Sequence, residues 1–319
     1  MSVRLPRAPH ERRSGLCVLV VAGVVLTACG GGSGEDPAGD GSAAASSSSE
    51  PAQIWAEGTT GSMEVVADVS GRKLNGDCSG TNTDAPTVLL EVGMGGNPDT
   101  FNGVRDHLAP LTTFCLYDRA GTAFSDEPDE LPRPVTDVVE DMDAFLRQAA
   151  DQGAGPPYVL VGHSFGGELA FLYAQAHPDQ VAGFLAINPS PPSQTWLARA
   201  RTVETEAELA EYELPYFEGD NEESVVLTSD ESMLTDPLPP DLPYGVLFDE
   251  RCEDLPPPLQ EEARCAALVG QLELTMQDLA RVGAGGSYTR VDGAGHFIMV
   301  TRPDVVLPQI DALLAGMTP

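Results

Sequence analysis

The apolar positions of this chain fall into short continuous runs that alternate with longer segments of helical periodicity. Runs rich in β-branched, leucine and aromatic residues predict strands, and they lie at residues 87–92, 113–117, 157–161, 181–187, 244–248 and 287–291. Helical spacing of apolar residues predicts helices at residues 101–111, 134–151, 168–177, 260–282 and 303–314. A hairpin over residues 63–74 precedes them. The alternation predicts an α/β fold, with a mostly parallel central sheet and helices on both faces.

One segment interrupts this alternation. Residues 189–242 are acidic, punctuated by prolines and only partly helical, with the clearest helical pattern at residues 202–212. Segments of this length between two strands are uncommon as plain loops. We therefore expect residues 189–242 to form a lid that is inserted into the α/β domain.

A glycine-bracketed serine follows the strand expected at residues 157–161. It reads Gly162-His163-Ser164-Phe165-Gly166, and a helix-forming run comes next. The pattern G-x-S-x-G between a strand and a helix predicts a nucleophile elbow, in which a strained turn exposes the serine hydroxyl. Side chains two residues before and after the serine would collide in such a turn, which explains the glycines. Ser164 is therefore the candidate nucleophile, and a structural serine in a tight turn is the alternative.

The N-terminus has the features of an export signal. Arginines at positions 4, 7, 12 and 13 precede an apolar run at residues 16–26 that is too short to span a bilayer. Leu26-Thr27-Ala28-Cys29 resembles the lipobox of bacterial lipoproteins, which implies cleavage before Cys29 and a lipid on its sulfur. The alternative is an ordinary secreted protein with a chance cysteine. We expect a signal peptide at residues 1–28, a flexible Gly/Ser/Ala tether at 29–54 and one domain at 55–319.

Acidic residues dominate the charge of the chain. It holds 17 Lys and Arg against 49 Asp and Glu, which gives a formal net charge of −32. A field of this sign repels nucleic acid and anionic lipid head groups. The composition therefore argues against nucleic acid as a partner and leaves the expected lipid on Cys29 as the contact with the membrane.

Cysteine usage agrees with export. If Cys29 carries a lipid, an even number of cysteines follows it in an oxidising compartment: Cys78, Cys115, Cys252 and Cys265. Three pairings are possible. We favour Cys78–Cys115, because the two strands that carry them should be near each other, and Cys252–Cys265, because the pair closes a small loop. No C-x-x-C spacing or histidine cluster points to a metal site, so we expect no metal.

Five stretches of the chain together resemble the α/β-hydrolase superfamily. The resemblance covers residues 63–319, and these stretches carry it: Gly93-Met94-Gly95-Gly96, Tyr117-Asp118-Arg119-Ala120-Gly121, the elbow, Gly293-Ala294-Gly295-His296-Phe297 and Arg302-Pro303-Asp304. It is similar to the exported members in particular. It implies a Ser-acid-His triad in that chain order, an acyl-enzyme and no cofactor.

The resemblance assigns the general base to His296. This residue follows the last predicted strand in a glycine-rich loop, where it can reach over the edge of the sheet. The other histidines of the domain are expected to pack or to cap helices, and the ring of His163 is expected to point away from the serine. His296 would take the proton of Ser164 and return it to the leaving group.

The acid of the triad should follow the strand that ends at Phe248. Asp249 is the first candidate, and three further acids lie close behind it, namely Glu250, Glu253 and Asp254. The family's alternative position, after the strand that follows the elbow, holds Asn188. An asparagine can form a hydrogen bond with the ring but cannot neutralise an imidazolium.

The backbone N–H groups of Met94 and Phe165 are the oxyanion donors that the resemblance implies. Where the family often has His-Gly before the first donor, this chain has Val92-Gly93. The Gly93–Gly96 loop has a second interpretation as a dinucleotide site, but the third glycine of that fingerprint would fall on Pro98. Asp118 and Arg119 are expected to form a structural ion pair near the site.

These features predict a serine hydrolase that is lipid-anchored on the extracytoplasmic face of the cell membrane. Its substrate would be a small or medium molecule with a carboxylic ester bond. Two alternatives stay open. One is a peptidase or amidase similar to the proline-aminopeptidase-like relatives, and the other is a binding protein that keeps the fold without turnover.

Overall fold

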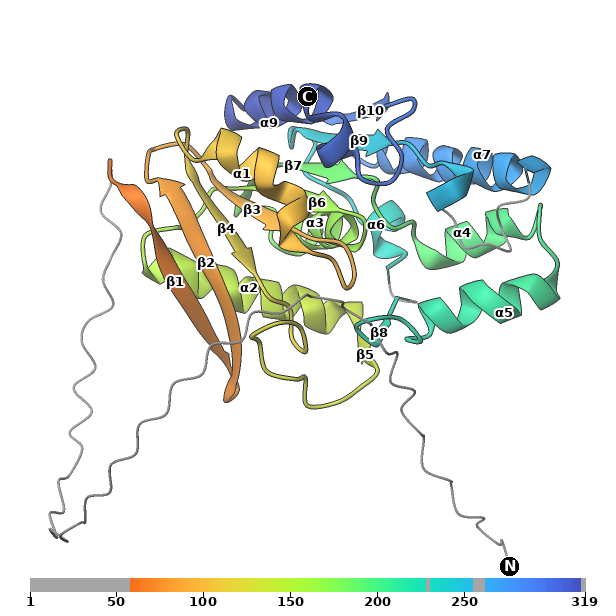
Figure 1. Cartoon of the computed structure of the whole chain (residues 1–319), viewed down its shortest axis with the longest axis horizontal. Helices are drawn as coiled ribbons and strands as arrows, with labels where there is room; N and C mark the ends of the chain where they lie inside the picture. The colour runs from red at the N-terminus through yellow and green to blue at the C-terminus, as the bar shows by residue number, and fades with distance from the viewer. Residues whose placement is uncertain (1–57, 228–229, 255–261, 317–319) are drawn as a thin grey trace, which may run out of the picture. The chain divides into compact units, whose positions relative to one another are not determined.

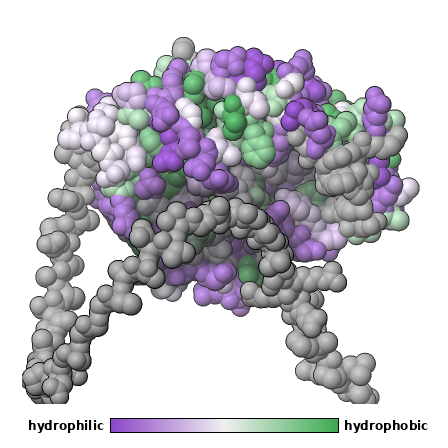
Figure 2. Space-filling view, viewed as in Figure 1, coloured by the Kyte–Doolittle hydropathy of each residue, from purple (hydrophilic) through white to green (hydrophobic). Residues whose placement is uncertain are grey.

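The computed structural model describes residues 58–227, 230–254 and 262–316 (Figure 1). The predicted signal peptide and tether, including Cys29, lie outside the described residues. Within the described residues no helix combines the length and the apolar character needed to cross a membrane. Hydrophilic residues are spread over the face of the molecule that Figure 2 draws, and hydrophobic residues lie among them in small groups.

A mixed sheet forms the centre of the domain. Its strands lie in the order β1 (Thr60–Val69), β2 (Arg72–Thr81), β4 (Thr113–Tyr117), β3 (Thr87–Glu91), β6 (Tyr158–His163), β7 (Val181–Ile187), β9 (Tyr244–Phe248) and β10 (Gly286–Arg290). β1 and β2 pair antiparallel, as do β2 and β4, and every pair from β4 to β10 is parallel. The predicted strands and the mostly parallel sheet are confirmed.

Helices cover both faces of this sheet (Figure 1). One apolar cluster joins the sheet to α1 (Asn102–Leu108) and α9 (Pro303–Leu314), and the other joins it to α2 (Val135–Asp151), α3 (Phe165–Ala176) and α7 (Glu262–Leu279). The strands serve both clusters because successive side chains point to opposite faces. In β3, for example, Val88 and Leu90 belong to the first cluster and Leu89 to the second.

The N-terminal hairpin turns at Ser70 and Gly71. Both residues have positive φ, 56° and 92°, which is the backbone that a two-residue type I′ turn requires. The Gly71 N–H donates to Asp68 Oδ1 at 2.7 Å, which holds the turn. The predicted hairpin is therefore confirmed, and its second strand continues to Thr81.

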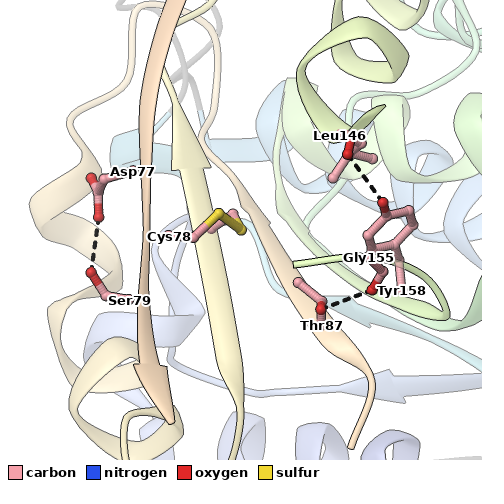
Figure 3. The surroundings of a disulfide bond; sticks show 8 residues. Asp77, Cys78, Ser79, Thr87, Leu146, Gly155 and Tyr158 are labelled. Atoms are coloured by element: carbon pink, nitrogen blue, oxygen red, sulfur yellow. Dashed lines mark hydrogen bonds between the residues drawn. A yellow bond between two sulfur atoms is a disulfide. The ribbon is translucent and has the colours of Figure 1, made fainter. Parts of the chain in front are cut away.

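Both favoured disulfides are present. Cys78 of β2 lies directly opposite Cys115 of β4 in the antiparallel register, with 4.0 Å between the Cα atoms, and the bond joins the two strands (Figure 3). Cys252, in the short 3₁₀ helix η2 (Cys252–Asp254), is bonded to Cys265 of α7. The second bond fixes the chain just after β9 to the helix that packs on that strand.

The inserted segment, residues 189–242, lies between β7 and β9. It contains α4 (Ser193–Ala200), α5 (Glu206–Phe217), β8 (Val225–Val226) and α6 (Ser232–Thr235). The helix predicted at residues 202–212 is wrong in its bounds. Thr205 and Glu208 form a capping box, so the helix starts at Glu206. Helix α4 was not predicted. Its buried residues do recur at helical spacing, but only two of the four are large and apolar: Ser193, Trp196, Leu197 and Ala200.

The remaining elements tie this segment to the domain. β8 pairs in parallel with β5 (Arg133–Pro134), just ahead of α2. The 3₁₀ helix η1 (Pro98–Phe101) leads into α1, and the short helix α8 (Ile298–Thr301) leads into α9. The carboxyl ends of β3, β6, β7 and β9 lie along one edge of the parallel sheet, which is where open α/β sheets bind ligands.

Candidate active site

Ser164 occupies a strained turn between β6 and α3. Its φ of 53° and ψ of −120° lie in a region that residues other than glycine rarely adopt. Such strain persists only where the surroundings enforce it, and it is concentrated at functional sites. The strand, the turn and the helix are those that the G-x-S-x-G pattern predicts.

Steric contacts explain the two bracketing glycines. A Cβ atom at Gly162 would lie 2.0 Å from the carbonyl oxygen of Gly166, which is the collision that the sequence predicts. A Cβ atom at Gly166 would lie 2.2 Å from the carbonyl oxygen of Glu91 in the neighbouring strand β3. The second glycine therefore lets α3 approach the sheet, which places the start of the helix beside the loop after β3.

His296 lies in a tight loop after β10. Gly293 and Gly295 have φ of 76° and 70° and turn the chain back over the sheet edge. The Gly295 N–H donates to Asp249 Oδ2 at 2.8 Å, and Asp249 Oδ1 is 3.4 Å from Arg290 Nη2. Asp249 is thus buried and holds the backbone of residues 293–297, the histidine loop, and its carboxylate is not the one against the ring.

The carboxylate against His296 is that of Glu250, which corrects the first choice of acid. Glu250 Oε2 is 3.0 Å from His296 Nδ1. Both residues follow β9, and neighbouring side chains of an extended chain point to opposite sides, so only one of them can face the ring. The carboxylate of Glu253 pairs with Arg251 at 2.7 Å and is largely exposed, and the side chain of Asp254 lies outside the described residues.

Asn188, which follows β7, supports this pair. Its Nδ2 donates to the Asp249 carbonyl at 2.8 Å and its Oδ1 accepts from the Asp249 N–H at 3.2 Å, so these two bonds fix which end of the amide is nitrogen. Nδ2 also lies 3.0 Å from Glu250 Oε2 and 3.0 Å from His296 Nδ1. The two N–H groups of Nδ2 serve the Asp249 carbonyl and the Glu250 carboxylate, so neither is left for His296 Nδ1. The Nδ1 atom therefore carries a proton and donates it to Glu250. The sequence identified Asn188 as the residue at the alternative acid position, but it did not predict its contacts with Asp249 and Glu250.

His163 lies against the histidine loop, a contact that no sequence pattern predicts. Its Nε2 is 3.0 Å from the backbone oxygen of His296, and the centroids of the two rings are 4.7 Å apart. Burial, with His296 close by, lowers the pKa of His163 to about 3. The neutral ring therefore donates a hydrogen bond to the His296 carbonyl. His107 and His177 pair with Asp311 and Asp143 away from this site.

Ser164, His296 and Glu250 line one pocket of about 180 Å³. The rest of the lining is mainly apolar, and the inserted segment supplies Trp196, Tyr216 and Phe217. Phe248 and Leu272 line it from β9 and α7. Among the described residues, no group of three His, Cys, Asp or Glu side chains is placed to hold a metal ion.

The loop after β3 packs against the elbow. A Cβ atom at Gly93 would lie 3.2 Å from Ser164 Cβ, so the chain here passes directly beside the serine. The N–H groups of Gly95 and Gly96 are bound to Glu223 Oε1 at 2.9 Å and to the Gly93 oxygen at 3.0 Å. Phe165 is the first residue of α3, so its N–H has no acceptor within the helix.

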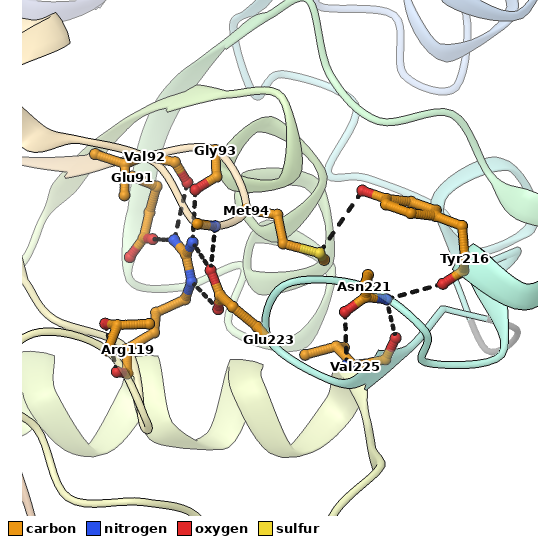
Figure 4. Close-up of polar contacts among 11 residues, drawn as sticks. Glu91, Val92, Gly93, Met94, Arg119, Tyr216, Asn221, Glu223 and Val225 are labelled. Atoms are coloured by element: carbon orange, nitrogen blue, oxygen red, sulfur yellow. Dashed lines mark hydrogen bonds and ion pairs between the residues drawn. The ribbon is translucent and has the colours of Figure 1, made fainter. Parts of the chain in front are cut away.

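The predicted ion pair between Asp118 and Arg119 is not present. The buried guanidinium of Arg119 contacts Glu91 Oε2 at 3.2 Å and Glu223 Oε1 at 2.5 Å (Figure 4). Asp118 instead accepts the Phe124 N–H at 3.1 Å. Burial raises the pKa of Glu91 to about 7, although the charge and hydrogen bond of Arg119 lower it. For Glu223 the hydrogen bonds and charge of Arg119 outweigh burial and hold its pKa below the usual range.

Comparison with known proteins gives one family match and several partial ones. The sequence matches the model of the alpha/beta hydrolase family over residues 88–309. It is 26% identical over 129 residues to the uncharacterized protein YbdG of Bacillus subtilis, a match that covers 40% of this chain and 38% of that one. It is 32% identical over 119 residues to the probable transporter efuK of Hormonema carpetanum, over 37% of this chain and 16% of that one. The chain thus spans less than half the length of these relatives.

Solved structures share the fold over most of the domain. An enol-lactonase of Burkholderia xenovorans has a TM-score of 0.53 at 18% identity, over 78% of this chain and 99% of that one. An esterase of Thermogutta terrifontis has a TM-score of 0.51 at 17% identity, over 80% and 98%. Likeness at this identity shows the fold alone. Because the family model spans well over half of the sequence and the sheet and elbow agree with it, this chain belongs to the alpha/beta hydrolase family.

Proposed function

We propose that this protein is a serine hydrolase that cleaves a carboxylic ester of a small or medium substrate through an acyl-enzyme. One observation carries the proposal: the strained Ser164 lines the same pocket as His296, whose Nδ1 is 3.0 Å from Glu250 Oε2. A serine, a histidine and a carboxylate in this relation form the machinery that activates a hydroxyl for acyl transfer. The esterase and the lactonase among the structural neighbours support an ester as the bond.

In the proposed mechanism Ser164 Oγ attacks the ester carbonyl while His296 Nε2 takes its proton. Glu250 accepts the Nδ1 proton in a hydrogen bond and stabilises the imidazolium. The N–H groups of Met94 and Phe165 stabilise the oxyanion. Collapse of the tetrahedral intermediate breaks the ester C–O bond, and the alcohol leaves with the proton from His296. Water then attacks the acyl-enzyme, passes a proton to His296 and releases the acid, which restores Ser164.

The pocket favours a short, apolar acyl group. Its volume of about 180 Å³ lies below the 300–1,000 Å³ that is usual for drug-sized ligands. Trp196, Tyr216 and Phe217 present aromatic surface on the side of the inserted segment. We therefore expect hydrolysis of p-nitrophenyl acetate and butyrate to be faster than that of the decanoate.

The test uses the full chain with p-nitrophenyl esters of increasing chain length, beside Ser164→Ala and, as a matched control, the exposed Ser62→Ala. Activity that Ser164→Ala abolishes and Ser62→Ala retains supports the proposal. If no ester is cleaved but a fluorophosphonate still labels Ser164, the bond is an amide or peptide. If the wild type is not labelled at all, the protein is a binding protein on this fold.

We also propose that Cys29 carries a lipid that anchors the protein on the extracytoplasmic face of the cell membrane. This proposal rests on the lipobox-like sequence, and the two disulfides support it because they form in oxidising compartments. Wild-type protein should enter the detergent phase of a phase-separation assay, and Cys29→Ser should stay in the aqueous phase. An N-terminal peptide of the wild type with an unmodified Cys29 thiol would refute the anchor.

A further inference from the structure

Arg119 contacts both halves of the proposed oxyanion hole. Its side chain is 2% exposed, and its Nη1 and Nη2 donate to the carbonyl oxygens of Val92 and Gly93 at 2.8 and 2.7 Å (Figure 4). Its guanidinium carbon also lies 5.2 Å from the ring centroid of Phe165. One buried cation therefore holds the chain on each side of the site where the oxyanion would form.

Because the peptide bond is planar, the contact of Arg119 with the Gly93 carbonyl also sets the direction of the Met94 N–H. The Gly93–Met94 peptide is trans, so its C=O and N–H point in opposite directions in one plane. When Arg119 binds this carbonyl, the N–H of Met94 is therefore held in the same plane and points away from the guanidinium. The direction of the proposed donor thus depends on Arg119.

Glu223 holds the next peptide group. Its Oε1 accepts from the Gly95 N–H at 2.9 Å and from Arg119 Nη2 at 2.5 Å, and its Oε2 accepts from Arg119 Nε at 2.8 Å. The two peptide groups on either side of the Met94 Cα are therefore both fixed, one by Arg119 and one by Glu223. Glu223 belongs to the inserted segment, 104 residues after Arg119 in the sequence.

The guanidinium has no donor left over. It carries five N–H groups, and these serve Glu91, Val92, Gly93 and both oxygens of Glu223. Full use of a planar fork permits only one arrangement of its partners. The loop that carries Met94 is consequently held in a single geometry, which catalysis by a preorganised donor requires.

The inserted segment presents Glu223 on a turn that is closed by Asn221. Asn221 Nδ2 donates to the carbonyl oxygens of Tyr216 and Val225 at 2.8 Å each, and its Oδ1 accepts from the Val225 N–H at 3.0 Å (Figure 4). Tyr216, at the other end of this turn, lines the pocket. The same turn thus joins the pocket wall to the carboxylate that binds Arg119.

We propose that Arg119 and Glu223 are positioning residues that couple the inserted segment to the oxyanion donor Met94. The inference rests on the proposed function, since it needs Met94 to act as a donor. Where related proteins often have a histidine before Gly93, this chain has Val92. We assign the support of the loop to Arg119 and Glu223 instead. The polar atoms of both side chains are bound to protein partners, and neither side chain lines the pocket with Ser164, so we assign them positioning rather than catalytic roles.

The test is Glu223→Asp, beside Glu222→Asp as a matched control at the exposed neighbouring position. The shorter side chain withdraws the carboxylate by about 1.5 Å and keeps its charge. We expect kcat for p-nitrophenyl butyrate to fall about 100-fold, because misplacement by about 1 Å can have that effect, with KM within about twofold. Affinity for phenylboronic acid, which forms a tetrahedral adduct with the serine, should fall with kcat/KM because the adduct uses the same donors.

Three results would overturn the inference. The first is a Glu223→Asp variant with kcat within about twofold of wild type, and the second is one in which only KM or Tm changes, since a merely structural role predicts that pattern. If Glu223→Asp does not fold, Asn221→Ala, which loosens the turn, decides by the same split between kcat and KM. The third is a wild type that neither cleaves esters nor reacts with a fluorophosphonate, which overturns the proposed function as well.

Discussion

At the scale of single residues, the two neighbouring acids after β9 contact different groups around His296. Glu250 faces the ring of His296, and Asp249 holds the Gly295 N–H behind it. Glu250→Gln removes the negative charge that orients and stabilises the imidazolium. We expect kcat for ester hydrolysis to fall by about 10³- to 10⁴-fold, as for the equivalent change in known triads, with Tm nearly unchanged.

Asp249→Asn is the comparison for that variant. It weakens a charged hydrogen bond to Gly295, so we expect the free energy of unfolding to drop by about 1–2 kcal/mol while most of the activity survives. Urea titrations and initial rates on both variants separate the two roles. The opposite pattern, with Asp249→Asn inactive and Glu250→Gln active, would return the triad to the acid that the sequence favoured first.

At the scale of elements, the two disulfides stabilise different parts of the molecule. Cys78–Cys115 joins two strands that contribute no residue to the lining of the Ser164 pocket, whereas Cys252 lies two residues after Glu250 and is bonded to α7. We expect loss of the first bond, as Cys78→Ala with Cys115→Ala, to lower stability by about 2–4 kcal/mol and to leave kcat nearly unchanged at low temperature.

Loss of the second bond should act on the chemistry. In Cys252→Ser with Cys265→Ser the segment that carries Glu250 is no longer fixed to α7, so we expect kcat to fall by about tenfold through misplacement of the acid. Parallel measurements of kcat and Tm on the two double variants test this difference. Equal losses of kcat in both, or none in the Cys252 and Cys265 variant, would contradict it.

At the scale of the whole molecule, buried carboxyls set the pH dependence of stability. Glu168 of α3 is fully buried, and both its oxygens are without a hydrogen-bond partner among the described residues. Burial and the nearby Asp230 raise its pKa well above normal, and burial raises the pKa of Asp230 to about 7. Between their unfolded and folded pKa values the native state binds more protons than the unfolded state, so stability falls as the pH rises through about 7.

Urea titrations at pH 5, 6.5 and 8 check this expectation, with the highest free energy of unfolding at pH 5. Glu168→Gln removes a group that must ionise at high pH, so its free energy of unfolding should decline less than that of wild type between pH 5 and 8. The exposed Glu64→Gln serves as the control. Identical slopes for wild type and Glu168→Gln would show that Glu168 does not bind the proton.

The sequence by itself determined the features that depend on local sterics and periodicity. Apolar runs and helical spacing define elements because burial on one or both faces follows from the period alone. The elbow at Ser164 could be predicted because its two glycines avoid collisions that a Cβ atom would make within a few residues or with the adjacent strand. The cysteine pairs followed from the neighbouring strands and from a short separation along the chain. Family membership was predicted from the resemblance of five motif stretches, the elbow among them, to the alpha/beta hydrolases.

Only the tertiary structure decided which polar groups meet. Asp249 and Glu250 are adjacent acids after the same strand, and what distinguishes them is the side of the chain that faces His296. The partners of Arg119 are Glu91 and Glu223 rather than the adjacent Asp118, because a buried guanidinium needs carboxylates brought to it by folding. His163 lies under the histidine loop for the same reason. Such pairings depend on how strands and the inserted segment are placed in space, and no local pattern records that placement.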